Sequence, residues 1–559
     1  QILVNGTSSL RFRDSVDHVY VPGDSVSLDA SVSDELTVEA WFKFPDSNIL
    51  DEYKYGPAFG YQPDLIQISE GVYGIAYRDQ GQVGTLKTIR ITDGGAIIGD
   101  IYNHSIEFAD PCYWPKIIHV VNDTYLIALA TSDTNPKYCS LQAVQVLENG
   151  TTGPLLGSYS FGFKEVYDHD LIHIADNISA IVFRNNQQRG EIRTFGISDD
   201  GLTISNFSSD GAYVFEDSKC YEPNIIQVYG DIYAIAYRGQ NDEGIIKTVK
   251  IENDGKITKT VVSSFPFEQL NETFNPVLSR ISQNILAITY RDDYSTNIHR
   301  GFIKTVEILD NGTITQQVND TLMFDGTYCN LPKIANIVGD IFVIAYETDD
   351  GDSQSPDGYV AVVEIAENGS IYDSVISKTK FNRGTNTFGY EPDILRVTDE
   401  IYAIAFRCGS SYGTPHEGTL ITNLLTDYST PDPSAPFSRG LVLKEGAYGI
   451  FVNRTHIAIH IQNVLYKVLL DSIASIDSSN FYNWHHVAFT YNKTILVIYF
   501  DGLPIFSTNA NVDLICSSVP IYFGKNFFGF IDEVAIFPWV LTDAEILEHK
   551  INPASLENI

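Results

Sequence analysis

The chain has 559 residues, of which 71 are Asp or Glu and 36 are Lys or Arg, so its formal net charge is −35. This acidity excludes nucleic acid as the expected partner, because phosphate neutralisation needs clustered basic side chains. Hydrophobic residues make up 44% of the chain, which excludes disorder as its main state, and no apolar run reaches the ~18 residues of a membrane span.

The chain begins at Gln1, without a Met, a basic segment or an apolar segment, and we expect it to be the mature form of an exported protein. Asn-x-Ser/Thr triplets, which accept glycans only in exported proteins, occur roughly twice as often as chance would give. The predicted acceptors are Asn5, Asn103, Asn122, Asn149, Asn177, Asn206, Asn271, Asn311, Asn319, Asn368, Asn453 and Asn492. These features predict a secreted or cell-surface glycoprotein.

From residue 63 onward, one sequence pattern recurs along the chain. The segment PDLIQISEGVYGIAYR from Pro63 returns, for example, as PNIIQVYGDIYAIAYR from Pro223 and as PDILRVTDEIYAIAFR from Pro392. The seven copies begin at Pro63, Pro115, His169, Pro223, Pro276, Pro332 and Pro392, at spacings of 52, 54, 54, 53, 56 and 60 residues. The regular spacing indicates a repeat architecture.

Within one copy, two apolar runs joined by a polar turn precede a third run that begins with Gly, such as the run from Gly244, and a short fourth run. Four strands at a period of about 50 residues are typical of a β-propeller blade. The last copy lacks its fourth strand, but residues 47–55, before the first copy, contain a matching run. A ring closed in this way has no free edge, so we predict one seven-bladed propeller over residues 45–435.

The flanking segments, residues 1–44 and 436–559, contain runs that alternate apolar and polar residues, as half-buried strands do. Five motifs stand out: LTVEAW from Leu36, WHHVA from Trp484, YFDG from Tyr499, GFIDEV from Gly529 and LTDAEI from Leu541. In this order they resemble a laminin-G-like domain of the concanavalin A-like jelly-roll superfamily. The expected fold class is all-β, with the seven-bladed propeller inserted into a jelly-roll sandwich. Thr542 and Glu545 form a capping-box pattern for one terminal helix.

The same resemblance implies one cofactor. Some laminin-G-like domains hold a structural Ca²⁺ with an N-terminal Asp and the Asp of the GFIDEV strand, which here are Asp14 or Asp17 and Asp532. The acidic loop 349–353 with Asp357 offers oxygen ligands for a second calcium site, although its spacing differs from an EF-hand and it also fits a solvated loop. The combination of domains resembles adhesin-type proteins of prokaryotic and archaeal cell surfaces.

Two sets of side chains are predicted to form rings on one face of the propeller. The second strand ends in Arg in five copies, and an aromatic residue stands two places before most repeat starts. They are Arg78, Arg184, Arg238, Arg291 and Arg407, with Tyr61, Tyr113, Tyr167, Tyr221, Tyr390 and Phe274. One interpretation is a funnel for an anionic or sugar ligand, built from Arg forks and aromatic platforms. The other is a set of blade-to-blade contacts that repeats because the fold repeats.

The chain has six cysteines, and none forms a CxxC pair, so a zinc site has little support. Cys112 stands three residues before a repeat start, and Cys139 lies after the second strand of the same copy, on the same expected face. We therefore predict a disulfide between Cys112 and Cys139. The pairing of Cys220, Cys329, Cys408 and Cys516 stays open.

These features predict a non-catalytic extracellular protein for adhesion or for binding glycans or other surface proteins. A subunit of a surface lattice or filament, which would bind copies of itself, belongs to the same class. The alternative is a propeller-type glycoside hydrolase, because some sialidases also combine a propeller with a lectin-like domain. The nearest match to their turn motif, residues 197–204, lacks the Ser and the Trp, and the repeat count is seven whereas sialidases resemble six-bladed propellers. A symmetric ring also offers no distinct acid and nucleophile.

Overall fold

The structure is a computed structural model that divides into two compact units, Asp51–Leu424 and the combination of Gln1–Leu50 with Leu425–Ile559. It describes residues 10–12, 19–21, 35–43, 49–56, 58–99, 105–131, 138–207, 211–295, 298–348, 357–382, 388–399, 401–409, 417–425, 440–444, 447–452, 456–462, 464–469, 473, 483–512, 521–523 and 529–551. Side chains are not described at 10–12, 19–21, 43, 161–167, 294–295, 424, 440, 456, 529–530 and 532–533. Within these residues, no helix is long and apolar enough to cross a membrane.

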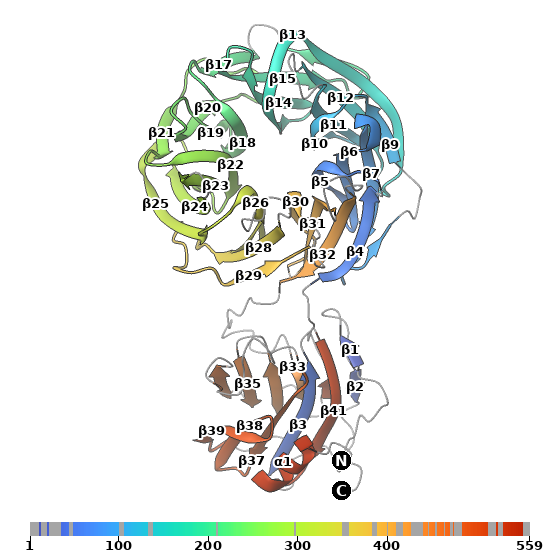
Figure 1. Cartoon of the computed structure of the whole chain (residues 1–559), viewed down its shortest axis with the longest axis vertical. Coiled ribbons are helices and arrows are strands. Elements are labelled where there is room, and N and C mark those ends of the chain that lie inside the picture. Colours follow the sequence, from blue (N-terminus) through green and yellow to red (C-terminus); the bar gives the residue numbers. More distant parts are fainter. Residues whose placement is uncertain are drawn as a thin grey trace. The chain divides into compact units, whose positions relative to one another are not determined.

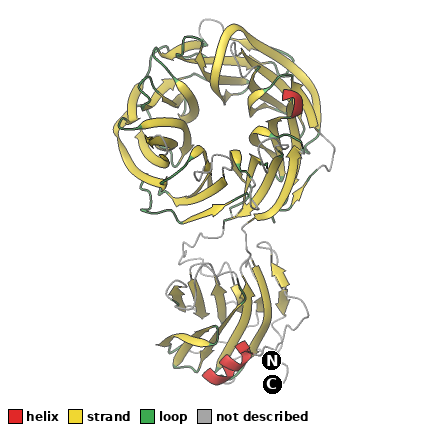
Figure 2. Cartoon of the chain, viewed as in Figure 1, coloured by secondary structure: helices red, strands yellow, loops and turns green. Residues whose placement is uncertain are grey.

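The fold is all-β, as predicted, and the larger unit is a β-propeller with seven blades arranged in a ring (Figures 1 and 2). Blade 1 contains β5 (Tyr61–Ser69), β6 (Val72–Arg78), β7 (Gly84–Ile91), β8 (Ile97–Ile98) and β9 (Ser105–Ala109). Blade 2 contains β10 (Tyr113–Val121), β11 (Thr124–Ala130), β12 (Tyr138–Val146) and the first part of β13 (Thr152–Ala175). Blade 3 contains the rest of β13, β14 (Ile178–Asn185), β15 (Gly190–Ile197), β16 (Ile204–Asn206) and β17 (Ala212–Glu216).

The remaining four blades each have four antiparallel strands. Blade 4 contains β18 (Tyr221–Tyr229), β19 (Ile232–Arg238), β20 (Gly244–Lys250) and β21 (Ser263–Glu268), and blade 5 contains β22 (Glu272–Arg280), β23 (Ile285–Ser295), β24 (Ile298–Ile308) and β25 (Ile314–Asp325). Blade 6 contains β26 (Asn330–Val338), β27 (Ile341–Thr348), β28 (Asp357–Glu364) and β29 (Ser377–Lys380). Blade 7 contains β30 (Tyr390–Arg396), β31 (Ile401–Arg407), β32 (Gly418–Leu424) and β4 (Ile49–Gly56).

The second strand of a blade is apolar along its whole length because both of its faces pack against other blades. In β19, every residue except the terminal Arg238 is buried. Tyr233 and Tyr237 pack into a core shared with blade 3, whereas Ala234 and Ala236 pack into a core shared with blade 5. A strand with two buried faces needs a continuous apolar run instead of an alternating one, which is the pattern that repeats in the sequence.

The ring is closed by β4, which pairs with β32 and supplies the fourth strand of blade 7. This confirms the closure predicted from residues 47–55. Tyr55 of β4 is fully buried, and its ring lies 4.9 Å from the ring of Tyr77 in blade 1. Its hydroxyl lies 3.3 Å from the carbonyl oxygens of Gly60 and Phe406, so one side chain from β4 contacts both blades at the closure.

The smaller unit is a jelly roll of two six-stranded sheets. The first sheet has the order β1 (Leu10–Phe12), β41 (Gly529–Phe537), β3 (Leu36–Lys43), β37 (His485–Tyr491), β38 (Ile495–Phe500) and β39 (Leu503–Asn509). The second has the order β2 (Val19–Val21), β40 (Ile521–Phe523), β33 (Gly440–Lys444), β34 (Tyr448–Val452), β35 (His456–Ile461) and β36 (Val464–Leu469). Both sheets combine strands from the two flanks, with β1 and β3 in the first sheet and β2 at the edge of the second, so neither flank forms the jelly roll alone.

The helix α1 (Asp543–Ile551) is fixed to the first sheet by a buried polar cluster. His549 Nδ1 lies 2.8 Å from Glu39 Oε1, and His486 Nε2 lies 3.3 Å from Glu39 Oε2. Burial opposes ionisation of the Glu39 carboxyl, but the two histidines outweigh burial and lower its pKa. The predicted capping box begins the helix, because the Glu545 amide donates to Thr542 Oγ1 and the Thr542 amide donates to Glu545 Oε2.

The predicted disulfide between Cys112 and Cys139 is wrong, because both residues are buried free thiols. Cys112 packs in the core shared by blades 1 and 2, whereas Cys139 packs in the core shared by blades 2 and 3. The two thiols therefore lie on opposite faces of blade 2. Burial raises the pKa of both thiols to about 12, so they stay protonated and unreactive in the folded chain.

We expect Tyr55→Ala to lower the free energy of unfolding by about 3–5 kcal/mol, since it leaves a cavity at the ring closure. Tyr372→Ala is the matched control, because Tyr372 is 61% exposed and its loss should cost less than about 0.5 kcal/mol. Urea denaturation of the full chain measures both. Equal loss of stability in the two variants would show that β4 does not secure the ring.

A second measurement tests the free thiols. Denatured, unreduced protein should react with a thiol reagent at both Cys112 and Cys139, whereas the folded protein should leave both unlabelled because they are buried. Peptide mass spectrometry reads the label at each site. A peptide pair joined through these two cysteines would contradict the structure.

Candidate functional site

The predicted Arg and Tyr side chains meet between neighbouring blades. Arg238 of blade 4 lies between two rings, 4.3 Å from the centroid of Tyr221 in its own blade and 4.3 Å from that of Phe274 in blade 5. The same geometry recurs for Arg78 between Tyr61 and Tyr113, and for Arg407 between Tyr390 and Tyr61, while Arg184 lies over Tyr221 and Arg291 over Phe274. The side chain of Tyr167 is outside the described residues. Each sandwiched guanidinium thus joins two blades through cation–π contacts.

Carboxylates contact the edges of the same guanidinium groups. Arg184 pairs with Asp168 at 3.0 Å, and Arg291 pairs with Asp293 at 2.7 Å. Arg238 pairs with Asp242 at 2.7 Å. Face and edge contacts together account for much of the surface of each guanidinium, which is the arrangement expected of blade-to-blade contacts. Ligand binding by these rings stays a prediction.

Closer to the axis, the first strand of every blade contains a bulge with one residue in the left-handed region. The register between the first and second strands shifts there, for example between Tyr61 and Asp64 in blade 1. The seven left-handed residues, here called the axial ring, are Gln62, Trp114, Asp168, Glu222, Asn275, Leu331 and Glu391, with φ of 55°, 52°, 38°, 52°, 49°, 47° and 51°. None is Gly, the residue that adopts this conformation at least cost, and such strained positions cluster at binding sites.

Side chains of the axial ring bind the backbone of the following blade. The Gln62 amide donates to Glu391 Oε2 at 2.9 Å, and the Trp114 amide donates to Gln62 Oε1 at 2.8 Å. Blades 4 and 5 repeat the pattern, with bonds from the Glu222 amide to Asp168 Oδ2 and from the Asn275 amide to Glu222 Oε2. These bonds stabilise the left-handed backbone and hold the blades in register.

The pattern changes where the axial ring has no side-chain acceptor. Leu331 cannot accept a hydrogen bond, and Glu347 at the end of β27 replaces it by accepting from the Glu391 amide at 2.8 Å. Trp114 cannot accept one either, and its indole is 45% exposed. The ring is therefore symmetric in backbone and differentiated in side chains, which is what recognition of an asymmetric ligand requires.

A second ring lies two residues further along each first strand and consists of Asp64, Lys116, Asp170, Asn224, Val277, Lys333 and Asp393. Its acceptors also bind the next blade: Asp393 Oδ2 accepts from the Leu65 amide at 2.7 Å, and Asp64 Oδ2 accepts from the Ile117 amide at 2.8 Å. Asp64 forms an ion pair with Lys116 as well. The ring contains two lysines in a chain that is otherwise strongly acidic.

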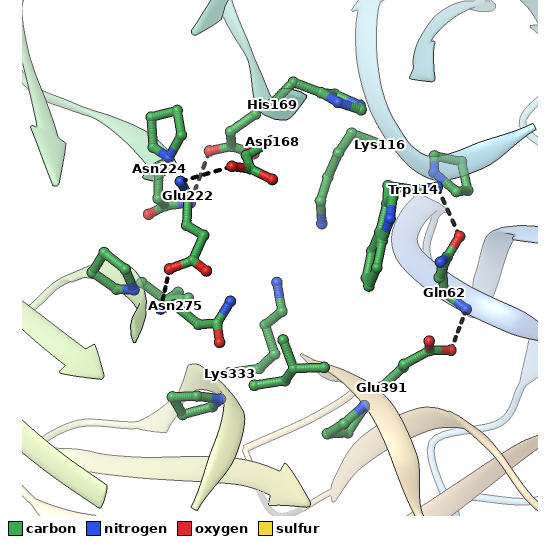
Figure 3. Close-up of a pocket in the computed structure, with 18 of the residues that line it drawn as sticks. Gln62, Trp114, Lys116, Asp168, His169, Glu222, Asn224, Asn275, Lys333 and Glu391 are labelled. Carbon is green, nitrogen blue, oxygen red and sulfur yellow. Dashed lines mark hydrogen bonds between the residues drawn. The ribbon is translucent and has the colours of Figure 1, made fainter. Parts of the chain in front are cut away.

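The axial ring and part of the second ring line a cavity of about 380 Å³, to which all seven blades contribute residues (Figure 3). Figure 3 shows Trp114, Lys116 and His169 on one side of the cavity and Lys333 extending toward it from blade 6. His169 replaces the repeat Pro, and its Nε2 is buried without a hydrogen-bond partner among the described residues. Burial and the charge of Lys116 lower the pKa of His169 to about 4, so its imidazole is neutral near pH 7.

Sequence reasoning missed Trp114, Lys116, His169 and Lys333. It singled out the Arg and Tyr residues because they are the same in most copies. The residues that face the cavity occupy the positions just before and just after the repeat start, where the copies differ most. Comparing the seven copies for variation at those two positions would have found the cavity, because a differentiated site in a symmetric fold must break the repeat.

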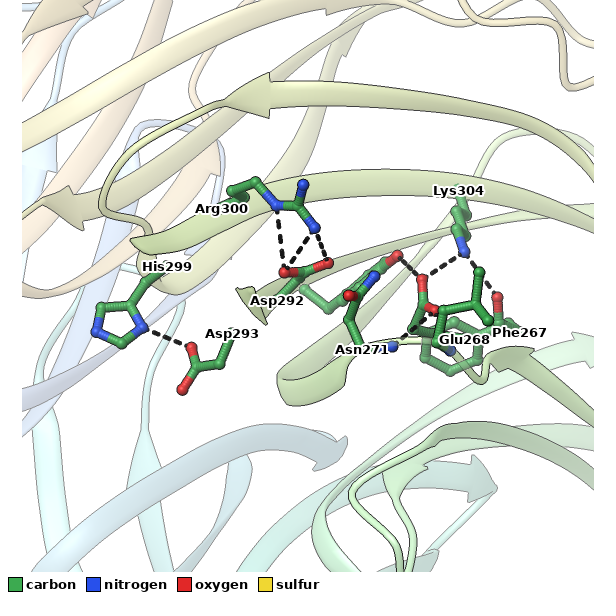
Figure 4. Close-up of polar contacts among 10 residues, drawn as sticks. Phe267, Glu268, Asn271, Asp292, Asp293, His299, Arg300 and Lys304 are labelled. Atoms are coloured by element: carbon green, nitrogen blue, oxygen red, sulfur yellow. Dashed lines mark hydrogen bonds and ion pairs between the residues drawn. The ribbon is translucent and has the colours of Figure 1, made fainter. Parts of the chain in front are cut away.

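Charged side chains also gather between blades 4 and 5, away from the cavity (Figure 4). Glu268 of blade 4 accepts from Lys304 Nζ at 2.8 Å and from the Tyr290 hydroxyl at 2.9 Å, both in blade 5. Arg300 pairs with the buried Asp292 at 2.8 Å. These charges are matched, so the cluster connects blades and presents no ligand site.

The predicted calcium ligands lie mostly outside the described residues. This is true of Asp14, Asp17 and the loop 349–353, and of the side chain of Asp532, whose backbone pairs with Trp41. In the part of the chain that the structure describes, no group of three or more His, Cys, Asp or Glu side chains could hold a metal ion. Calcium binding therefore stays a prediction.

Comparison with known families gives a match for one part of the chain. Residues 431–547 match the model of the concanavalin A-like lectin/glucanases superfamily. These residues contain the C-terminal flank of the jelly roll, which the sequence motifs had assigned to that superfamily. No curated protein matches the chain.

Several solved structures are similar to the chain at low identity. A lectin from Burkholderia pseudomallei has 8% identity and a TM-score of 0.45, over 67% of this chain and 98% of its own. A Trypanosoma rangeli sialidase mutant that displays trans-sialidase activity has 13% identity and a TM-score of 0.32, over 92% of this chain and 97% of its own. An α-L-arabinofuranosidase from Fusarium graminearum has 12% identity and a TM-score of 0.38, over 57% of this chain and 95% of its own.

We expect Arg238→Ala to reduce the free energy of unfolding by about 2 kcal/mol, because two desolvated cation–π contacts and an ion pair are lost. Arg189→Ala is the control: this side chain is 43% exposed and pairs only with exposed Asp217, so its loss should cost less than about 1 kcal/mol. Thermal unfolding of the full chain compares them. An unchanged stability of the Arg238 variant would argue against a blade-to-blade role.

Proposed function

We propose that this protein is a non-catalytic binding protein of the cell surface or extracellular space and that its propeller binds a glycan in the axial cavity. The observation that carries the proposal is the exposed side chain of Trp114 within a cavity whose other walls combine prolines and a few aliphatic residues with polar side chains. An aromatic face combined with a few oriented donors and acceptors is well suited to hold a sugar ring. The volume of about 380 Å³ is within the range of small-molecule sites, roughly 300–1,000 Å³.

The jelly roll supports a carbohydrate-related role as well. The superfamily that matches residues 431–547 includes lectins and glucanases by name. A second glycan-binding surface on this unit would let one molecule bind two glycans, which strengthens attachment through effective concentration.

Export of the protein is supported by the placement of the glycosylation triplets. Of the triplets that fall on described residues, six have an exposed Asn, as a glycan acceptor requires: Asn122, Asn149, Asn311, Asn319, Asn368 and Asn492. Asn149, Asn311 and Asn368 occupy equivalent turns between the third and fourth strands of their blades. A glycan there would extend into solvent without disturbing a blade.

A glycoside hydrolase is the second candidate, because Asp168 and Glu222 line the same cavity. Burial raises the pKa of Glu222, which is also what a general acid needs. Both carboxylates, however, accept a backbone amide of the next blade, and Asp168 pairs with Arg184. Groups that hold the ring together in this way are poorly placed to move during a reaction, so binding without turnover is the better-supported function.

A surface protein of this kind could act as an adhesin or as a subunit of a lattice. Sedimentation velocity over a range of protein concentrations separates them, because only a lattice or filament subunit associates with itself. We expect the purified protein to stay monomeric.

The axial site is tested by Trp114→Ala on a glycan array, followed by calorimetry on the glycans that bind. We expect a loss of affinity of at least about tenfold, since stacking on the indole is removed. Trp539→Ala is the matched control, because Trp539 is 40% exposed but belongs to the jelly roll.

If Trp539→Ala weakens binding and Trp114→Ala does not, the glycan site is on the jelly roll. Chromatography of the glycan after incubation tests the alternative: released sugar would establish a hydrolase and overturn the non-catalytic assignment.

A further inference from the structure

Two ammonium groups face the axial cavity from separate blades. Lys116 extends from β10 of blade 2 and Lys333 from β26 of blade 6, and Figure 3 shows both side chains directed into the cavity. The charge of Lys116 is the largest influence on Lys333 and lowers its pKa, whereas the charges of Asp393, Asp64 and Asp170 act in the opposite direction. These carboxylates offset part of the repulsion between the two ammonium groups, and a bound anion would offset more of it.

The two lysines differ in their partners. Lys116 forms an ion pair with Asp64 of blade 1. Lys333 forms no hydrogen bond or ion pair with any residue that the structure describes, and Figure 3 shows its ammonium without a bonded neighbour. Leaving a half-buried cation unpaired costs free energy, which a bound anion would recover.

The nearby acids are committed to other contacts. Asp170 Oδ2 accepts from the Ile225 amide at 3.0 Å and from Asn224 Nδ2 at 2.8 Å. Asp393 Oδ2 accepts from the Leu65 amide at 2.7 Å. Burial raises the pKa of both carboxyls, which weakens them as counter-charges for Lys333.

We infer that the axial cavity is specific for an acidic sugar whose carboxylate binds Lys333 and Lys116 while its ring stacks on Trp114. The inference rests on the proposed glycan-binding function and adds the chemical class of the glycan. Ammonium–carboxylate hydrogen bonds are stronger than neutral ones, so the carboxylate supplies affinity and the indole orients the ring.

The test compares each acidic sugar with its own methyl ester, which keeps the shape and removes the charge. Glucuronic, galacturonic and N-acetylneuraminic acid and their esters are titrated into the full chain by calorimetry near pH 7. We expect at least one acid to bind about tenfold or more tighter than its ester. In Lys333→Gln this preference should fall to about twofold or less, while the affinity for the ester stays the same within about twofold.

Two controls separate binding from stability. Lys250→Gln removes a lysine that pairs with Asp231 away from the cavity, and it should leave the acid preference unchanged. Thermal unfolding of Lys333→Gln should be unchanged or shifted to a higher temperature, because an unpaired charge is removed.

The outcomes distinguish the inference from the function on which it rests. Equal affinity for acids and esters, or a preference that survives Lys333→Gln, would overturn the acidic specificity and leave glycan binding intact. If neither acids, esters nor any neutral glycan on the array bind, the proposed function fails together with the inference.

Discussion

Pairing between β4 and β32 determines whether the larger unit is a ring or an open stack of blades. Each blade buries both faces of its second strand against neighbours, so one missing contact exposes apolar surface on two blades. The cavity depends on the same pairing, because it takes residues from all seven blades. At the same junction, Glu391 in β30 of blade 7 accepts a hydrogen bond from the Gln62 amide of blade 1, so the axial ring is completed where the propeller closes.

Polar groups near the axis divide into two kinds. Carboxylates such as Glu391 and Asp393 bind backbone amides of the next blade and are part of the architecture. The side chains of Trp114 and Lys333 have no such role and are the groups left for a ligand. In a repeat protein, symmetric contacts stabilise the fold and departures from symmetry carry specificity.

Much of the fold could be predicted from the sequence, because repeats, turn residues and caps act over short distances. The seven copies, the closing strand and the capping box at Thr542 needed no knowledge of tertiary contacts. The disulfide prediction failed because it depended on which face of blade 2 each thiol occupies, and Cys112 and Cys139 face different neighbours. The cavity was missed for a related reason: bulges direct residues such as Trp114 toward the axis, and a bulge changes the face that simple alternation assigns.

The split jelly roll imposes an order on folding during translation. Val38 of β3 pairs with Phe489 of β37, so the apolar side chains of β3 lack this partner until the whole propeller and β37 have been made. Once the propeller has folded, it brings the ends of the two flanks close together, because β4 and β32 are neighbours in blade 7. The folded propeller then replaces a long flexible connection between the flanks by a short rigid one. The entropy lost on joining the two flanks is then small, and the jelly roll assembles like a domain whose halves are already tethered. Until then the exposed apolar side chains of β3 are prone to aggregation.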